Sequence, residues 1–269
     1  MFMHTKNGTV HLKDDTMYYI RFGSGSKTLL MLPGLGDGLT TVKGTALPMA
    51  LMYRAYAKEY TVYMFSRRNH LPDGYSTKEM AHDLKEAMDA LNIEKADFIG
   101  ISMGGMIAQH FAADYPDRVG KLVLAVTSAE PNPILTESVS EWIELAKSGN
   151  HTALMDGNVR RMYSTTYYQR NRWLIPIMGK LTKPKSYNRF FIQADACRTH
   201  RASDRLSAIT APTLVIGGAK DQTLGGDASR ALVAAIPNAT LKMYAEWGHG
   251  LYEEAKDFNQ IVLNSLCDK

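Results

Sequence analysis

The residues best suited to chemistry in this 269-residue chain are a serine and its two flanking glycines. The segment Gly100-Ile101-Ser102-Met103-Gly104 follows an apolar run that predicts a strand, and a helical pattern begins directly after it. A sharp strand-to-helix turn crowds the positions two before and two after the serine, so glycine is favoured at both. Such a turn exposes the Ser102 hydroxyl at a sheet edge, and the pattern predicts a nucleophile.

A nucleophilic serine needs a base, and the base needs an acid that orients it. Asp221 follows one apolar run by a short glycine-containing turn, and His249 lies between two glycines after the next run. Parallel strands place their carboxyl ends at one sheet edge, where Ser102 is also expected. We therefore predict a catalytic triad in the chain order serine, aspartate, histidine. Asp204 and Asp227 are poorer candidates for the acid.

The negative charge that develops on a substrate oxygen needs hydrogen-bond donors. The N–H of Met103 lies at the expected helix N-terminus, where backbone N–H groups have no helical acceptor. A second donor is expected from the loop after residues 28–32, where Gly34 lets the backbone approach a ligand closely, and we assign it to the N–H of Leu35. This loop lacks the spacing of a phosphate-binding loop, so a nucleotide site is not expected.

Short apolar or β-branched runs alternate with helical patterns along much of the chain. The expected strands are 28–32, 61–65, 96–101, 121–127, 212–217 and 240–244, and the expected helices are 77–91, 103–115, 226–236 and 251–266. This alternation predicts an α/β fold with a mostly parallel, twisted sheet flanked by helices. Residues 9–12 and 17–22 predict an antiparallel hairpin at the sheet edge.

The alternation stops between Glu130 and Ala208, where no strand is predicted. This block is too long and too regular to be a loop. Four helices are expected in it, at residues 136–147, 152–163, 166–181 and 185–200. We therefore predict a core domain of residues 1–130 and 207–269, with a helical cap (lid) of residues 131–206 inserted after the sixth strand, above the strand ends where open α/β sheets bind ligands.

Aromatic side chains of this block and one loop histidine are candidates for the wall of a substrate pocket. His70 follows the strand at 61–65, near the predicted catalytic edge. The candidates from the block are Tyr163, Tyr167, Trp173, Phe190 and Phe191. The alternative role of these aromatic side chains is packing against the core, and we expect it for most of them.

Charge and cysteine content exclude several classes of protein. The formal net charge is +4, and the basic excess lies in residues 151–206, which contain 11 Lys or Arg and 3 Asp. No nucleic-acid motif accompanies that excess, so a solvated helix face is expected rather than a nucleic-acid site.

Cys197 and Cys267 lack metal-ligand spacing, and we expect reduced thiols. Without a signal-peptide pattern or an apolar run of about 20 residues, we expect a cytoplasmic protein with no membrane span.

Four segments together resemble the α/β-hydrolase superfamily over nearly the whole chain. They are Pro33-Gly34-Leu35, G-I-S-M-G-G around Ser102, Gly-Gly-Ala-Lys-Asp221 and Gly-His249-Gly. The closest resemblance is to small capped serine hydrolases, a group with carboxylesterases, enol-lactonases, proline iminopeptidases and carbon–carbon bond hydrolases. Two segments depart from this group, since Leu-Pro-Gly stands where a His-Gly pair is usual and residues 66–70 replace Asp-x-Arg-Gly-x-Gly.

The resemblance and the triad together imply a carboxylesterase that cleaves small to medium esters through an acyl-enzyme intermediate. His249 would take the Ser102 proton, Asp221 would orient the imidazole, and the N–H groups of Leu35 and Met103 would bind the oxyanion. Water is the second substrate, and no metal or organic cofactor is expected. Carbon–carbon bond hydrolysis, lactone hydrolysis and lyase chemistry on the same triad are alternatives. A non-catalytic small-molecule-binding protein of this fold is a further one.

Overall fold

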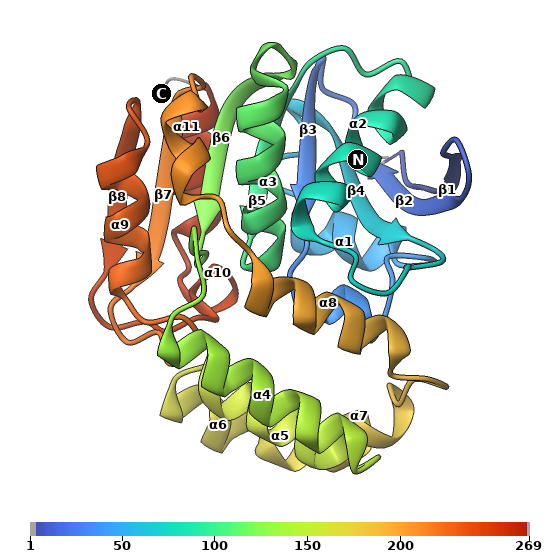
Figure 1. Ribbon diagram of the computed structural model, residues 1–269, viewed down its shortest axis with the longest axis vertical. Helices are drawn as coiled ribbons and strands as arrows, with labels where there is room; N and C mark the ends of the chain where they lie inside the picture. Colours follow the sequence, from blue (N-terminus) through green and yellow to red (C-terminus); the bar gives the residue numbers. More distant parts are fainter. Residues whose placement is uncertain (1–3, 268–269) are drawn as a thin grey trace.

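The computed structural model describes residues 4–267, and its centre is an eight-stranded sheet (Figure 1). The order of the strands across the sheet is β1-β2-β4-β3-β5-β6-β7-β8. β2 runs antiparallel to β1 and β4, and every other neighbouring pair is parallel. The strands are β1 (Lys6–His11), β2 (Thr16–Phe22), β3 (Lys27–Leu32), β4 (Tyr60–Arg68), β5 (Ala96–Ile101), β6 (Val119–Ala125), β7 (Thr213–Gly218) and β8 (Ala239–Tyr244).

Helices cover both faces of this sheet, as the alternation in the sequence predicts. Those outside the long block after β6 are α1 (Ala46–Met52), α2 (Thr77–Ala90), α3 (Met103–Asp114), α9 (Asp227–Ala235), α10 (Leu251–Glu254) and α11 (Phe258–Cys267), with the 3-10 turns η1 (Leu35–Gly38) and η2 (Pro116–Arg118). A further 3-10 turn, η4 (Ser203–Ala208), lies at the end of that block, before β7. The single terminal helix expected at 251–266 is in fact two helices, because the chain leaves the helical conformation at Ala255.

Two hydrophobic cores lie on the two faces because successive strand residues point to opposite sides. Leu30 and Phe98 belong to the core beneath α2, α3 and α9. Their neighbours Leu29 and Ile99 belong to the core beneath α1 and α11. All four side chains are fully buried. The central strands are therefore continuous apolar runs, and the loops at their carboxyl ends carry the polar groups.

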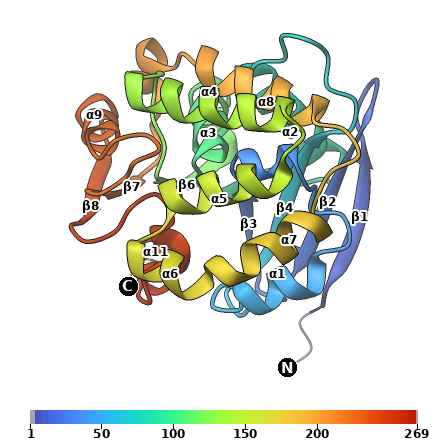
Figure 2. The same cartoon turned by 90° about the horizontal axis from the view of Figure 1, so that it is seen from below.

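The block between β6 and β7 is helical, as expected. Its helices are α4 (Pro133–Lys147), α5 (His151–Met162), α6 (Thr165–Asn171), α7 (Ile175–Leu181) and α8 (Asn188–Thr199). Figures 1 and 2 show these helices spread across one end of the sheet. One expectation was wrong, since the helix predicted at 166–181 is interrupted by the 3-10 turn η3 (Arg172–Leu174). Pro176 explains the interruption, because it has no N–H to donate to the carbonyl of Arg172 and is tolerated only in the first turn of α7.

The two cysteines are free thiols. Among the helices of residues 4–267, none has the length and apolar character needed to span a membrane.

Candidate active site

The predicted nucleophile lies at a strained turn between β5 and α3. Ser102 has φ 54° and ψ −120°, a left-handed conformation that is rare for a residue with a side chain. Its backbone N–H donates to the carbonyl of Ala125 at 2.9 Å, so sheet pairing continues up to the serine. A strained backbone conformation persists only where the surrounding structure holds it in place, and such residues are frequent at functional sites. The turn presents Ser102 at the carboxyl end of the sheet.

The glycines singled out in the sequence lie where the chain is crowded. A Cβ added at Gly104 would lie 1.9 Å from the carbonyl oxygen of Leu32, and one at Gly100 would lie 2.6 Å from the Cα of Gly105. Neither position has room for a side chain. A Cβ at Gly34 would lie 3.3 Å from the Cβ of Ser102, so the loop after β3 rests against the nucleophile.

The structure brings the three predicted triad residues together. The His249 Nε2 lies 3.0 Å from the Ser102 Oγ, and the His249 Nδ1 lies 2.8 Å from the Asp221 Oδ2. The other Asp221 oxygen, Oδ1, accepts hydrogen bonds from the backbone N–H groups of Thr223 and Leu224, at 2.8 and 2.9 Å. Residues from three loops thus form one hydrogen-bonded chain, in which Ser102 lies 147 positions from His249 in the sequence and Asp221 lies 28 positions from it.

The electrostatics of this chain favour an ionised Asp221. Burial alone raises the pKa of Asp221, but the attraction of His249 and hydrogen bonds from His249, Leu224 and Thr223 outweigh it and lower that pKa below its usual value. An ionised carboxylate accepts the Nδ1–H of a neutral imidazole, which leaves Nε2 with a lone pair facing Ser102. The arrangement can therefore remove the serine proton. The alternative acids, Asp204 and Asp227, are exposed and lie outside this chain.

Two backbone N–H groups lie beside the nucleophile. Met103 is the first residue of α3, and Leu35 is the first residue of η1, in the loop that rests against Ser102. The N–H of a first helical residue has no acceptor within its helix. The positions of both groups are compatible with the role of oxyanion donor that the sequence analysis assigns to them, and this role stays a prediction.

A cavity of about 500 Å³ opens over Ser102 and His249. Much of its wall is apolar, and six methionines contribute to it: Met31, Met49, Met52, Met64, Met155 and Met162. Its two carboxylates belong to Asp37 and Glu253. Among the residues of the described chain that line it, none is Lys or Arg. The cavity therefore suits an uncharged, largely apolar molecule.

Comparison with known proteins agrees with this geometry. A family model described as alpha/beta hydrolase fold matches residues 27–161. The chain belongs to the α/β hydrolase fold family. The α/β-hydrolase fold and the resemblance inferred from the sequence are thereby confirmed, and the family and the names of the relatives support hydrolase activity.

Two curated relatives of this α/β hydrolase carry the same name, 2-hydroxy-6-oxononadienedioate/2-hydroxy-6-oxononatrienedioate hydrolase. The chain is 31% identical to the one from Cupriavidus pinatubonensis, over 97% of this chain and 96% of the relative. It is 29% identical to the one from Paraburkholderia xenovorans, over 93% and 90%. Among solved structures, the enol-lactonase from Burkholderia xenovorans LB400 has the same fold, with a TM-score of 0.80, 22% identity and coverage of 96% and 99%.

Of the residues predicted to line the pocket, Tyr163 lies on the cavity wall. His70 does not, and its side chain is 91% exposed. The loop after β4 is instead bound to the turn between β1 and β2, where His70 N–H and Nδ1 contact the Asp15 carboxylate at 2.8 and 2.9 Å and the Asn69 N–H donates to the carbonyl of Thr16. These contacts hold the His70 ring away from the cavity.

The other aromatic candidates also lie outside the cavity wall. Phe190 is fully buried and Phe191 packs against the same core, which is the alternative role that the sequence left open. Trp173 lies on the short turn η3 and is 65% exposed, over a separate surface depression against α5. Tyr167 lines a neighbouring groove.

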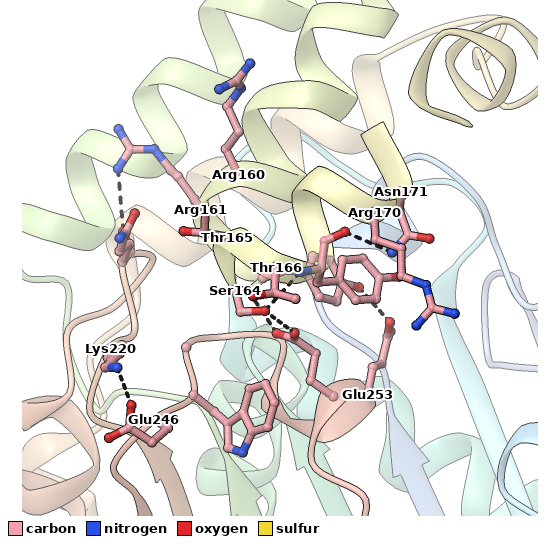
Figure 3. A pocket seen from close by; sticks show the side chains of 16 residues that line it. Arg160, Arg161, Ser164, Thr165, Thr166, Arg170, Asn171, Lys220, Glu246 and Glu253 are labelled. Atoms are coloured by element: carbon pink, nitrogen blue, oxygen red, sulfur yellow. Dashed lines mark hydrogen bonds and ion pairs between the residues drawn. The ribbon is translucent and has the colours of Figure 1, made fainter. Parts of the chain in front are cut away.

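That neighbouring groove, of about 850 Å³, lies between α6 and the loops after β7 and β8 (Figure 3). Tyr163 and Glu253 lie on the wall of both the groove and the catalytic cavity. The Tyr163 hydroxyl donates to the Glu253 Oε2 at 2.6 Å, and its ring stacks on Tyr167 at 4.2 Å. Beside this pair, the Glu254 carboxylate accepts from the N–H and hydroxyl of Ser164 at 2.9 and 2.6 Å. The wall of the groove thus carries two carboxylates whose hydrogen-bond donors are uncharged, and one of them, Glu253, lies where the groove meets the cavity.

Several wall residues carried no signal in the sequence. Trp142, His151, Tyr252 and Glu253 come from α4, α5 and the segment after His249, and nothing in their local sequence sets them apart. Asp37 is different, because it lies in the glycine-rich loop that was assigned the second oxyanion donor. A charged residue in such a loop is a sequence feature that could have identified Asp37 as a candidate functional residue.

Proposed function

We propose that this protein is a serine hydrolase that cleaves small to medium uncharged carboxylic esters through an acyl-enzyme intermediate. One observation carries the proposal: the hydrogen-bonded Ser102, His249 and Asp221 open into a largely apolar cavity with no Lys or Arg in its described wall. A serine triad supplies the nucleophile and the base, and the apolar wall selects the substrate.

In the first half of the reaction, the His249 Nε2 accepts the proton of the Ser102 hydroxyl as its oxygen attacks the ester carbonyl carbon. The carbonyl π electrons move to the oxygen, where the N–H groups of Leu35 and Met103 stabilise the negative charge. Asp221 stabilises the imidazolium that results. The tetrahedral intermediate collapses, its carbon–oxygen bond to the alcohol breaks, and His249 returns the proton to the leaving alcohol.

In the second half, a water molecule replaces the alcohol. His249 removes a proton from this water as it attacks the acyl carbon, and the same two N–H groups bind the second oxyanion. Breakdown of this intermediate returns the proton from His249 to the Ser102 oxygen and releases the carboxylic acid. The cycle needs no group beyond those named and water.

The methionine-rich wall supports a substrate with a flexible acyl chain. Methionine side chains are unbranched and polarisable, so they adapt to apolar groups of different shapes. A carboxylate buried in such a cavity would need a cationic partner, and the described wall offers none. Glu253, at the cavity mouth, would also repel an anion.

We further propose that residues 131–206 act as a cap over this site. Its helix α5 contributes Met155, Val159 and Met162 to the same cavity wall as the core residues of β3 and β5. The end of α5 is attached directly beside the base, since the N–H of Gly250 donates to the carbonyl of Met162 at 2.6 Å. The substrate would therefore be enclosed between the core and this cap.

A second candidate function is carbon–carbon bond hydrolysis. It is favoured by the relatives, whose printed names describe hydrolases of a dienedioate, and the similarity covers nearly the whole chain. The same triad would serve, with His249 transferring a proton to the substrate before the bond breaks. The name of that substrate denotes two carboxylates, however, and the cavity wall here provides no cation for either.

The deciding experiment compares p-nitrophenyl esters from acetate to decanoate with 2-hydroxy-6-oxononadienedioate, using wild type and Ser102→Ala. We expect ester turnover by wild type and a fall in kcat of about 10⁶-fold in the variant, comparable to other serine triads. Turnover of the dienedioate without ester hydrolysis would replace the proposal by the second candidate. If wild type cleaves neither and does not react with a fluorophosphonate, a binding protein of this fold is the better conclusion.

A further inference from the structure

A buried ionic cluster lies behind the loop that carries the Leu35 N–H. Its centre is Asp37, whose side chain is only 1% exposed. The Asp37 Oδ2 accepts hydrogen bonds from the backbone N–H of Arg67 at 3.2 Å, the Arg189 Nη2 at 2.7 Å and the Gln193 Nε2 at 3.1 Å. Burial alone raises the pKa of Asp37, but the charges of Arg67 and Arg189 outweigh it and lower that pKa, so the carboxylate is ionised.

Arg67 holds the other end of the same loop. Its side chain is buried, and its Nη2 donates to the carbonyl of Pro33 at 2.5 Å. The loop from Pro33 to Asp37 is thus attached at both ends to Arg67, near the carboxyl end of β4. Leu35 lies between these two attachments, and Gly34 rests against Ser102.

Arg189 reaches this cluster from α8, in the inserted block. Its Nε donates to the Asp37 carbonyl at 3.2 Å, its Nη1 to the Arg68 carbonyl at 2.6 Å and its Nη2 to the Arg67 carbonyl at 3.0 Å. α8 lies directly on the loop here, because a Cβ at Gly38 would lie 2.8 Å from the Cα of Phe190. One guanidinium therefore connects the inserted helices, the end of β4 and the oxyanion loop.

From these contacts we infer that Asp37, Arg67 and Arg189 are positioning residues that hold the Leu35 N–H at the distance from Ser102 that an oxyanion requires. The inference rests on the proposed function, because it concerns the oxyanion of that reaction. It makes the inserted block part of the catalytic machinery, since α8 supplies Arg189. A donor displaced by about 1 Å stabilises the transition state poorly while leaving substrate binding in the cavity largely intact.

The test compares Arg189→Gln, Arg189→Lys and a matched control, Arg205→Gln. Arg205 lies on η4 of the same inserted block, and it forms an ion pair with Asp114 of α3 instead of a contact with Asp37. We expect kcat on the preferred p-nitrophenyl ester to fall about 10- to 100-fold in Arg189→Gln, with KM within about twofold. Arg189→Lys should restore part of this loss, because an ammonium still balances Asp37 but lacks the planar set of donors. Arg205→Gln should keep the wild-type kcat.

A second measurement separates loop position from folding and from ester turnover. Butylboronic acid forms a tetrahedral adduct with a reactive serine, and calorimetry measures its affinity without any hydrolysis. We expect the affinity to fall in parallel with kcat across the Arg189 variants. Thermal unfolding of each variant reports whether it folds.

Several outcomes would overturn the inference. These are an unchanged kcat in a folded Arg189 variant, a loss confined to KM, an equal loss in Arg205→Gln, and failure of both Arg189 variants to fold, which would show a structural role alone. A wild type that hydrolyses no ester contradicts the proposed function instead, and the boronic acid titration then continues to test the position of the loop.

Discussion

Replacing Gly104 by alanine tests the nucleophile turn most directly. The added Cβ would lie 1.9 Å from the carbonyl oxygen of Leu32 and 2.8 Å from that of Pro33. Ordinary contact between such atoms begins above 3.4 Å, so one side must move by more than 1 Å. Leu32 cannot move easily, because β3 is paired on both sides, and α3 cannot withdraw, because residues 103–113 are all buried.

The cost follows from this geometry. Overpacking a rigid core costs about 1–3 kcal/mol, and we place this substitution at about 3 kcal/mol because both contacts are with backbone. Alanine is more favourable than glycine inside a helix, which offsets about 0.5–1 kcal/mol of this loss of stability. A displacement of about 1 Å between Ser102 and the oxyanion loop should also lower kcat about 100-fold.

Gly36→Ala is the matched control for stability. Its added Cβ would have no heavy atom within 4 Å, and Gly36 lies in the oxyanion loop after β3, which Gly104 faces. We expect its free energy of unfolding to stay within about 0.5 kcal/mol of wild type. Urea unfolding followed by tryptophan fluorescence measures both variants, and the rate of fluorophosphonate labelling reports the state of Ser102. A Gly104→Ala protein as stable and as active as wild type would refute the reasoning.

Three further predictions concern stability and substrate charge. Burial lowers the pKa of His200 to about 3, so between pH 6 and 4 the unfolded chain binds a proton that the folded chain does not. Stability in urea should therefore fall with falling pH by up to about 1.4 kcal/mol per unit, and His200→Asn should flatten this slope, whereas an unchanged slope contradicts the assignment. Glu253→Gln removes a negative charge from the cavity mouth, so it should raise the kcat/KM for p-nitrophenyl hemisuccinate relative to that for p-nitrophenyl butyrate about three- to tenfold. Glu246→Gln, outside the catalytic cavity, should leave this ratio unchanged. Equal ratios in both variants would count against a charge effect at the mouth. Ser76→Ala should lower the free energy of unfolding by about 1 kcal/mol with normal kcat, because it removes the capping box of α2, and a neutral result in urea would contradict this.

The features that could be predicted from the sequence alone are those that depend on steric limits and periodicity along short stretches of chain. The sharp turn at Ser102 admits only small residues around it, so Gly100 and Gly104 point to the elbow without any knowledge of the fold. Apolar runs and helical periodicity predict the alternation of strands and helices, and parallel pairing then brings Asp221 and His249 to the same edge. These inferences depend on sterics and periodicity within a few residues, and both act in every context.

The wall of the cavity was decided by tertiary structure. His70 is turned outward by Asp15, a residue 55 positions away, and the Asp37 carboxylate meets Arg189 across 152 positions. Methionines from β3, β4, α1 and α5 line one cavity only because these segments pack around it. No local pattern encodes such contacts, because each depends on which distant segments meet and how closely. The candidate catalytic residues could therefore be found in the sequence, whereas the residues that we propose to select a substrate and to hold the oxyanion loop required the fold.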